Sequence, residues 1–341
     1  MSLFSSFLDK NVALSHLGSG WLGALCADIV EAGRTNSYVE TVGCKADTLH
    51  RRAAYLDEAM LKRSFELAVR KVLSRLGLKR VELAIDGKKD LYYGKNKLSS
   101  RGIKHEHGTS QAWEYIVLSV VSPIKLPLMA VRYPQGKDLT SCCVELLDYA
   151  KTLPFKIDCV YFDRGFYTAK LIDYLENRKG GKALPYLIFA REDSKIKQYV
   201  EKTDNLGFYE HEFKYSYEKS KWKPTTTIVV VKNAGKNKKG EPYNMTFATN
   251  LKPSRLLVKK YKTRWNIETG FRIMEEGKIK TKTNNPLIRL FYFLLRCLLH
   301  LMWSLQREKG VSLVFKYYLR TLEKMLDKYR KKEPPPKKLF W

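Results

Sequence analysis

The stretch from Tyr261 to Arg272 restricts most strongly what this chain can fold into. Four of its polar side chains are spaced 3, 4 and 4 residues apart: Tyr261, Arg264, Glu268 and Arg272. On an α-helix this spacing places them on one face. A carboxylate flanked by two guanidiniums and a phenol suits a site where the carboxylate holds a cation and the arginines hold phosphate. The alternative is a solvated helix face with Glu–Arg pairs one turn apart.

Two further carboxylates favour the site over the solvated face. The apolar run 81–86 ends in Asp86, and the apolar run 157–162 is followed by Asp163. Each run predicts a strand that delivers an aspartate at its end, although either aspartate alone is also typical of a turn. Together with Glu268 they can hold two Mg²⁺ ions, which activate a nucleophile and stabilise a leaving oxygen in phosphodiester chemistry.

These three segments resemble the DDE transposases of bacterial and archaeal insertion sequences, in the ribonuclease-H-like superfamily. Tyr261, Arg264 and Glu268 match the Tyr-x2-Arg-x3-Glu-x6-Lys signature of the IS-four-like group. The segment from Arg264 to Arg272 is also similar to the archaeal ISH-three-like branch. The resemblance covers roughly residues 80–305.

The signature lysine is displaced in this chain, because its position holds Glu275. The nearest lysine is Lys278. Either the helix ends near Gly277 and Lys278 turns back, or the lysine's role is lost or passed to Lys280 or Lys282.

The resemblance implies a role for each residue at the site. Asp86, Asp163 and Glu268 would be catalytic and would bind two Mg²⁺ ions, with Mn²⁺ as the alternative. The other implied roles are in DNA binding. Arg264 and Arg272 would contact phosphates, Tyr261 would contact a terminal phosphate, and Arg164 would contact the DNA backbone. Lys278 would take the role of the displaced signature lysine. Trp265 either stacks on a flipped base or packs in the core, and its helical neighbours favour the core.

The resemblance and the composition together predict the partners. The net charge is +28 and the pI is about 9.7, and residues 251–341 hold 23 lysines and arginines against 7 acidic residues. Such an excess favours a polyanionic partner; the alternative is a basic, solvated surface. The expected partners are double-stranded DNA, as the inverted repeats of the element ends and as target, and a second copy of the chain in the end complex.

Other features bear on localisation. The six cysteines show no CxxC pair and no His at ligand spacing, which argues against a zinc site and favours buried thiols in a reducing compartment. The first residues lack a basic segment and do not form a signal peptide. The apolar run 290–303 is too short to span a membrane and predicts a buried helix. We therefore expect no membrane partner and a cytoplasmic, nucleoid-associated protein of a prokaryote.

The apolar runs and turns predict an α/β fold: a ribonuclease-H-like mixed sheet flanked by helices, with a β-rich insertion and an N-terminal helical region. Residues 1–79 are helical, and serve either in binding DNA ends or as a cap on the core. Residues 80–184 form the first part of the catalytic core and residues 185–250 the insertion. Residues 251–330 complete the core, and 331–341 form a basic, disordered tail.

Individual elements are predicted within these parts. Residues 47–76 have helical periodicity, with Asp47-Thr48 as a cap and Gly77 as a stop. In the insertion, strands 225–231 and 243–249 form a hairpin through the Gly-, Asn- and Lys-rich turn 232–240. In the core the strands are 81–86, 113–121, 127–133 and 157–162, and the helices are 138–151 and 168–178. Residues 88–110 read as a long polar loop that contacts DNA. A signature helix opened by Pro253 runs from 254 to 276, and two more helices follow at 287–305 and 312–330.

Two other functions remain open from the sequence. A non-enzymatic, domesticated DNA-binding protein would keep the charge but would not need three carboxylates. A metal-dependent nuclease would keep the carboxylates without strand transfer. Terminal inverted repeats beside the gene would favour the transposase over both.

Overall fold

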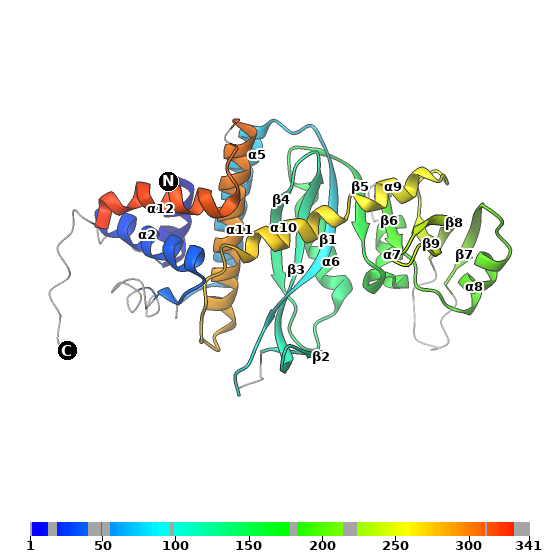
Figure 1. Ribbon diagram of the computed structural model, residues 1–341, viewed down its shortest axis with the longest axis horizontal. Coiled ribbons are helices and arrows are strands. Elements are labelled where there is room, and N and C mark those ends of the chain that lie inside the picture. Colours follow the sequence, from blue (N-terminus) through cyan, green and yellow to red (C-terminus); the bar gives the residue numbers. More distant parts are fainter. Residues whose placement is uncertain are drawn as a thin grey trace. The chain divides into compact units, whose positions relative to one another are not determined.

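The computed structural model describes residues 2–12, 19–39, 49, 55–95, 99–177, 183–213, 224–310 and 312–330. The chain forms two compact units. We call residues 78–91 and 101–269 the sheet unit, and residues 1–77, 92–100 and 270–341 the helical unit. Figure 1 labels the elements of both units.

The sheet unit is built on five strands in the order β4-β3-β1-β5-β6. Strands β1 (Arg80–Leu91), β3 (Thr109–Ser122) and β4 (Leu126–Arg132) are antiparallel neighbours. Strands β5 (Lys156–Phe162) and β6 (Tyr186–Phe189) run parallel to β1 and to each other. Three antiparallel strands followed by two parallel ones are the order of a ribonuclease-H-like sheet, so the predicted fold class is confirmed.

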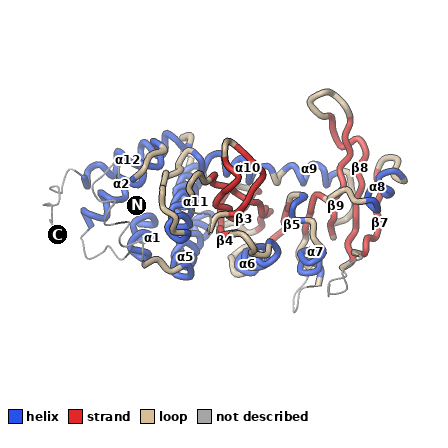
Figure 2. Tube along the Cα trace, turned by 90° about the horizontal axis from the view of Figure 1, so that it is seen from below, coloured by secondary structure: helices blue, strands red, loops and turns tan. Residues whose placement is uncertain are grey.

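The same sheet continues beyond β6. The added strands pair in the order β6-β9-β8-β7: β7 (Leu206–Glu212), β8 (Thr225–Lys236) and β9 (Pro242–Thr249). The β8–β9 hairpin was predicted from its Gly, Asn and Lys turn and is confirmed. Its tip projects from the sheet (Figure 2). Helix α8 (Ser194–Glu201), which the sequence analysis missed, precedes β7.

Helices cover both faces of this sheet. Helices α6 (Leu139–Lys151) and α7 (Ala169–Glu176) lie on one face, and α9 (Leu256–Lys262) lies on the other (Figure 2). Residues three apart on a strand point to opposite faces, and β6 shows this directly. The Tyr186 hydroxyl donates to Glu176 of α7, whereas the Phe189 ring contacts Tyr261 of α9. The α9 side carries the candidate site.

The helical unit contains α1 (Ser2–Val12), α2 (Ser19–Thr35), α5 (Glu58–Leu76), α11 (Pro286–Glu308) and α12 (Phe315–Arg330). Helix α11 is long and apolar enough to cross a membrane, but 89% of its most apolar window is buried inside the protein. Rings from α1, α5 and α11 pack together around Phe7, which contacts Phe65 and Phe291. The prediction of a buried helix here is confirmed.

Three details of the predicted secondary structure are wrong. Residues 88–110 are not one loop: β1 extends to Leu91, and β2 (Arg101–Glu106) pairs with the first part of β3. Cross-strand pairing with the long β3 holds these polar residues extended, a tertiary effect. The signature helix is two helices, α9 and α10 (Trp265–Glu275). It starts at Leu256, three residues after Pro253.

Some predictions fall on residues outside the described ranges. These are Cys44, the Asp47-Thr48 helix cap and the basic tail 331–341. The other five cysteines are free and buried, as predicted. Helix α5 begins after Asp57, whose side chain accepts from the Met60 amide. It ends at Gly77 in the left-handed region with φ 61°, as the glycine predicted.

Candidate functional site

The sheet places Asp86 and Asp163 next to each other. The parallel ladder of β1 and β5 ends at the pair Ile85–Phe162; Asp86 is the next residue of β1, and Asp163 directly follows β5. Neighbouring strands lie about 5 Å apart, so the two aspartates lie side by side at one end of the parallel ladder. Beyond this point β5 gives way to a short 3₁₀ turn, Arg164–Phe166, while β1 continues with β3.

Arg264 joins Asp86 to Glu268. Its guanidinium donates from Nη1 to Asp86 Oδ2 at 2.8 Å and from Nη2 to Glu268 Oε1 at 2.5 Å. The residue is only 5% exposed, whereas the Glu268 side chain is 54% exposed. One buried cation therefore connects a carboxylate of the sheet with a carboxylate of α10.

A break in the signature helix, between α9 and α10, determines the direction of the Arg264 side chain. The Arg264 amide donates to the Tyr261 carbonyl, and the Ile267 amide donates to the Arg264 carbonyl. These three-residue steps are 3₁₀ bonds, in which side chains three apart lie one above the other. The Arg264 guanidinium accordingly lies 5.6 Å from the centre of the Tyr261 ring.

Tyr261 holds Asp163 rather than reaching open solvent. It is 3% exposed, and its ring packs against Phe189 and Phe247 at 5.7 and 5.2 Å. Its hydroxyl lies 3.4 Å from Asp163 Oδ1 and 3.3 Å from the Phe162 carbonyl oxygen. Burial raises the pKa of this phenol above its ordinary value, so it stays protonated and can donate to the carboxylate.

Burial raises the pKa of Asp86 to about 6. The Arg264 guanidinium and the Gly87 amide, which donates at 2.8 Å, oppose this rise. Asp163 and Glu268 reinforce it by charge repulsion. Three carboxylates thus surround a single guanidinium. This excess of negative charge favours the binding of a further cation, which would relieve the repulsion between the carboxylates.

We expect Asp86 to make the folded state less stable as the pH rises from about 4 to about 6. Its pKa is 3.8 ordinarily and about 6 in the folded chain, so the folded state holds the proton more tightly. The stabilisation is present below the lower value and is lost through the upper one, about 3 kcal/mol in all. Urea unfolding of the metal-free wild type and of Asp86→Asn from pH 4 to 7.5 measures the difference. Parallel pH profiles would contradict the assignment.

The donor set fits divalent metal ions in its chemistry, since Mg²⁺ prefers carboxylate oxygens. Among the described residues no three His, Cys, Asp or Glu side chains are already gathered as for a metal. The Arg264 guanidinium lies between Asp86 and Glu268, two of the carboxylates that would hold such ions. The Glu268 side chain is 54% exposed, so it has room to leave Arg264, and the three carboxylates fit such ions in their chemistry.

The remaining predicted residues lie at or beyond this cluster. Arg164 directly follows Asp163 and is exposed, with its guanidinium 4.5 Å from the centre of the Phe189 ring. Arg272 is exposed on α10, one turn after Glu268. Lys278 belongs to the helical unit, where its ammonium lies 3.5 Å from Glu275 Oε2. The sheet unit therefore contains the three carboxylates, Tyr261, Arg264 and Arg164, whereas Arg272 and Lys278 belong to the helical unit.

Helix α10 ends at Glu275, close to Gly277 as one of the two predictions had it. The glycine is needed for space. A Cβ on Gly277 would lie 3.1 Å from the Phe315 ring, and one on Gly33 would lie 2.9 Å from the Gly277 carbonyl oxygen. Close packing in the helical unit thus fixes the turn that carries Lys278.

The prediction that Trp265 packs in the core is wrong, since the residue is 51% exposed. Helix α10 buries Ile267, Phe271 and Met274. At about 100° per residue, Trp265 lies about 200° from Ile267 and points away from that face. The buried positions, three and four apart, were the signal that the sequence analysis overlooked.

Two anchoring residues were missed. Asn266 donates to the Val121 carbonyl at 2.9 Å and ties α10 to β3. Lys260 pairs with Glu82 at 3.1 Å and ties α9 to β1. No local sequence pattern predicts either contact, because each joins residues more than 140 positions apart.

The sequence pattern of the family described as "Transposase DDE domain" matches residues 79–301, more than half of the chain. The chain belongs to the DDE transposases. This family generally uses divalent metal ions, and its members act in DNA transposition. Among curated proteins no match is found.

Solved structures give the same fold. The chain is similar to the piggyBac transposase in a synaptic complex with hairpin DNA, with a TM-score of 0.60 and 14% identity. The match covers 99% of this chain and 80% of that one. At this identity the likeness concerns the fold.

Proposed function

We propose that this DDE transposase catalyses metal-dependent DNA cleavage and strand transfer at the ends of an insertion sequence of the IS-four-like group, in its archaeal ISH-three-like branch. The observation that carries the proposal is the convergence of Asp86, Asp163 and Glu268 on one cluster with Arg264. Tyr261, Arg264 and Glu268 also follow the group's signature spacing. Three carboxylates from two strands and a helix have no evident use in a protein that only binds DNA.

The chain's own residues have distinct roles in this proposal. Asp86, Asp163 and Glu268 would hold two Mg²⁺ ions, with Mn²⁺ as the alternative; Glu268 would do so once its carboxylate has left Arg264. When bound, the ions lower the pKa of the attacking water or 3′-hydroxyl and stabilise the leaving oxygen. Tyr261 orients Asp163 by its hydrogen bond. Arg264, once released from Glu268, is placed to hold a DNA phosphate beside the carboxylates.

The partners follow from the charge and the family. We propose double-stranded DNA as the substrate, both as inverted-repeat ends and as target, bound by a homodimer that pairs two ends. Arg164 and Arg272, both exposed beside the carboxylates in sequence, contact the DNA backbone. The exposed Trp265 ring, next to Arg264, is free to stack on a flipped base. The protein acts in the cytoplasm of a prokaryote, at the nucleoid.

The experiment uses a duplex that ends in the inverted repeat found beside the gene, together with a circular target. Wild type with Mg²⁺ is expected to cut the duplex at the element end and to join its 3′ end to the target. EDTA should stop both reactions. Cutting without joining would favour the nuclease, and binding with neither reaction would favour a domesticated DNA-binding protein.

A prediction concerns the β8–β9 hairpin, which carries four lysines that are exposed or half-buried: Lys232 and Lys236 in the last part of β8, and Lys238 and Lys239 in the turn. Replacing all four by Ser should weaken assembly of the end complex, because the tip projects from the sheet and contributes phosphate contacts (Figure 2). Gel-shift titration measures assembly. The melting temperature should change little, since the turn buries little apolar surface. An equal loss of thermal stability would show that the hairpin is structural.

A second prediction concerns the displaced lysine. Lys278→Ala should lower strand transfer, while Lys280→Ala and Lys282→Ala should leave it near wild type. Lys278 is the lysine nearest to the end of α10 at Glu275, whereas Lys280 and Lys282 lie further along the chain. Strand-transfer assays on the three variants measure which lysine is needed. If only Lys280→Ala or only Lys282→Ala loses strand transfer, that lysine has the role of the signature lysine. If no variant loses strand transfer, the function of the signature lysine is absent from this chain.

A further inference from the structure

Helix α12 carries a row of cations on its outer face. Four exposed basic residues recur at every fourth position: Lys316, Arg320, Lys324 and Lys328. We call this row the α12 ridge. At 1.5 Å per residue its members are about 6 Å apart, and the ridge is about 18 Å long. The opposite face is apolar and buried, so the helix presents the ridge to solvent.

The ridge is not neutralised within the described part of the chain, where none of its members forms an ion pair. The two acidic residues of α12 are engaged by other arginines: Glu323 with Arg34, and Asp327 with Arg330 at 2.9 Å. Like charges one turn apart destabilise a helix. An arrangement that costs stability in the free protein is favoured when an anion lies along it.

A groove of about 540 Å³ opens at the first turn of the ridge. Its lining combines Arg34, Lys316 and Arg320 with Tyr317, whose side chain is 60% exposed, and with Glu276 and Val314. An exposed aromatic ring among cations is typical of surfaces that bind nucleic acid, where cations contact phosphates and rings contact sugars or bases.

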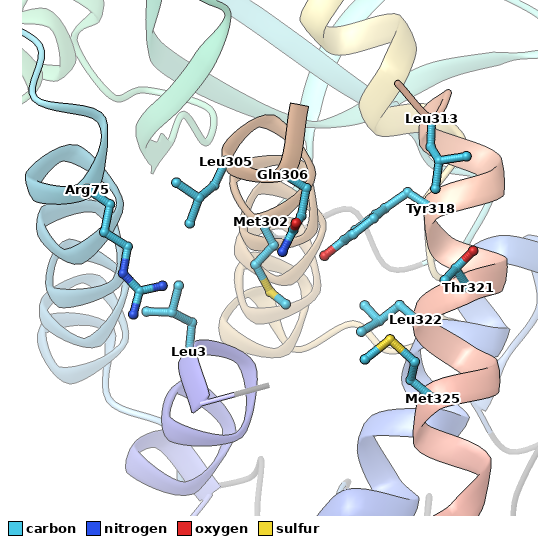
Figure 3. Close-up of a pocket in the computed structure, with 10 residues that line it drawn as sticks. All are labelled: Leu3, Arg75, Met302, Leu305, Gln306, Leu313, Tyr318, Thr321, Leu322 and Met325. Atoms are coloured by element: carbon cyan, nitrogen blue, oxygen red, sulfur yellow. The ribbon is translucent and has the colours of Figure 1, made fainter. Parts of the chain in front are cut away.

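Another hollow of the helical unit has a different character. Figure 3 shows Tyr318 and Leu322 of α12 on one side of α11 and Leu305 of α11 on the other, around a cavity of about 370 Å³. Its lining is mostly apolar, and it has no row of cations. Of these two surfaces of α12, the ridge with its groove is therefore the one whose positive charge suits a polyanion.

We propose that the α12 ridge is a second DNA-binding surface, which follows the phosphate backbone of duplex DNA. This inference rests on the proposed function and extends it to the helical unit. A regular row of cations matches a polymer with regularly repeated charges. An anionic membrane fits less well, because a helix that binds in a membrane surface must insert its apolar face. The apolar face of α12 is buried in the protein.

The test is the variant with Lys316, Arg320, Lys324 and Lys328 all replaced by Gln, which keeps the helix propensity. Binding to a duplex of about 40 base pairs is measured across salt concentrations. The variant should bind at least tenfold more weakly at low salt. The slope of log K against log salt should become shallower by as much as about 3.6, since each lost phosphate contact removes about 0.9.

Two controls sharpen the result. The first exchanges Lys and Arg at the four ridge positions and should bind like wild type. The second removes four charges from the sheet unit and should change the slope much less: Lys195, Lys197, Lys202 and Lys252 to Gln. Circular dichroism confirms that each variant is folded.

Each outcome has one meaning. A ridge variant with the wild-type slope overturns the inference, as does an equal change in the sheet-unit control. A ridge variant that binds DNA normally but no longer binds vesicles with anionic lipid assigns the ridge to membranes and also overturns it. Failure of the wild type to bind DNA, or to cut an element end in Mg²⁺, would instead refute the proposed function.

Discussion

Asp86→Asn, Asp163→Asn and Glu268→Gln should each lower cleavage of an element end by on the order of 10³-fold or more. Each change removes a negative charge from the cluster around Arg264 while keeping the shape of the side chain. A metal ion supplies several kcal/mol of charge stabilisation to the transition state, and each 1.36 kcal/mol corresponds to a factor of ten in rate. Cleavage of a labelled duplex end in Mg²⁺ measures the loss.

The control for this prediction lies on the same strand as Asp163. Asp158 pairs with the exposed Arg80 at the other end of β5, so Asp158→Asn should cut DNA at nearly the wild-type rate. DNA binding should survive in all four variants, because the phosphate-binding cations remain. Near-normal cleavage by any one triad variant would show that its residue is not a metal ligand.

Folding must be separated from catalysis for Asp86. Its carboxylate accepts from the buried Arg264 at Oδ2 and from the Gly87 amide at Oδ1; the one amide oxygen of Asn can keep the bond from Arg264 and loses the other. Asp86→Asn is therefore expected to stay folded, whereas Arg264→Ala would leave a buried carboxylate without its cation and cost several kcal/mol. Mg²⁺ should raise the melting temperature of wild type but not of Asp86→Asn, a readout that does not depend on activity.

The affinity for duplex DNA should fall about 10³-fold or more between roughly 50 and 200 mM salt, if six or more phosphates are contacted. The net charge of +28 motivates this expectation. Each phosphate contact releases bound counterions from the DNA, and added salt opposes that release. Fluorescence anisotropy of a labelled duplex across salt concentrations provides the measurement.

The salt dependence also separates two uses of the charge. A steep slope for duplexes with and without the inverted repeat means that phosphate contacts dominate, and the specific duplex should then differ mainly in absolute affinity. A flat slope would mean that the charge serves solubility, and it would remove the main support for DNA contacts outside the carboxylate cluster.

Local patterns determined most of the elements of this protein. The apolar runs before Asp86 and Asp163 correctly predicted β1 and β5, because a strand buried in a parallel ladder needs consecutive apolar residues. The turn residues at 232–240 correctly predicted the β8–β9 hairpin. The signature spacing placed Arg264 and Glu268 one helical turn apart. Such features depend on neighbours in the chain, so the sequence carries them directly.

Only the tertiary structure decided how these elements meet. The 3₁₀ step at Arg264 directs one guanidinium to both Asp86 and Glu268, and a spacing of 3, 4 and 4 on a straight helix does not contain that bend. Tyr261 binds the Asp163 carboxylate because the sheet buries its ring. The α12 ridge keeps its four charges without ion pairs because Glu323 and Asp327 are paired with Arg34 and Arg330 instead. Sequence alone thus named the charged residues, while contacts between distant segments determined which charges are neutralised and which remain free to bind.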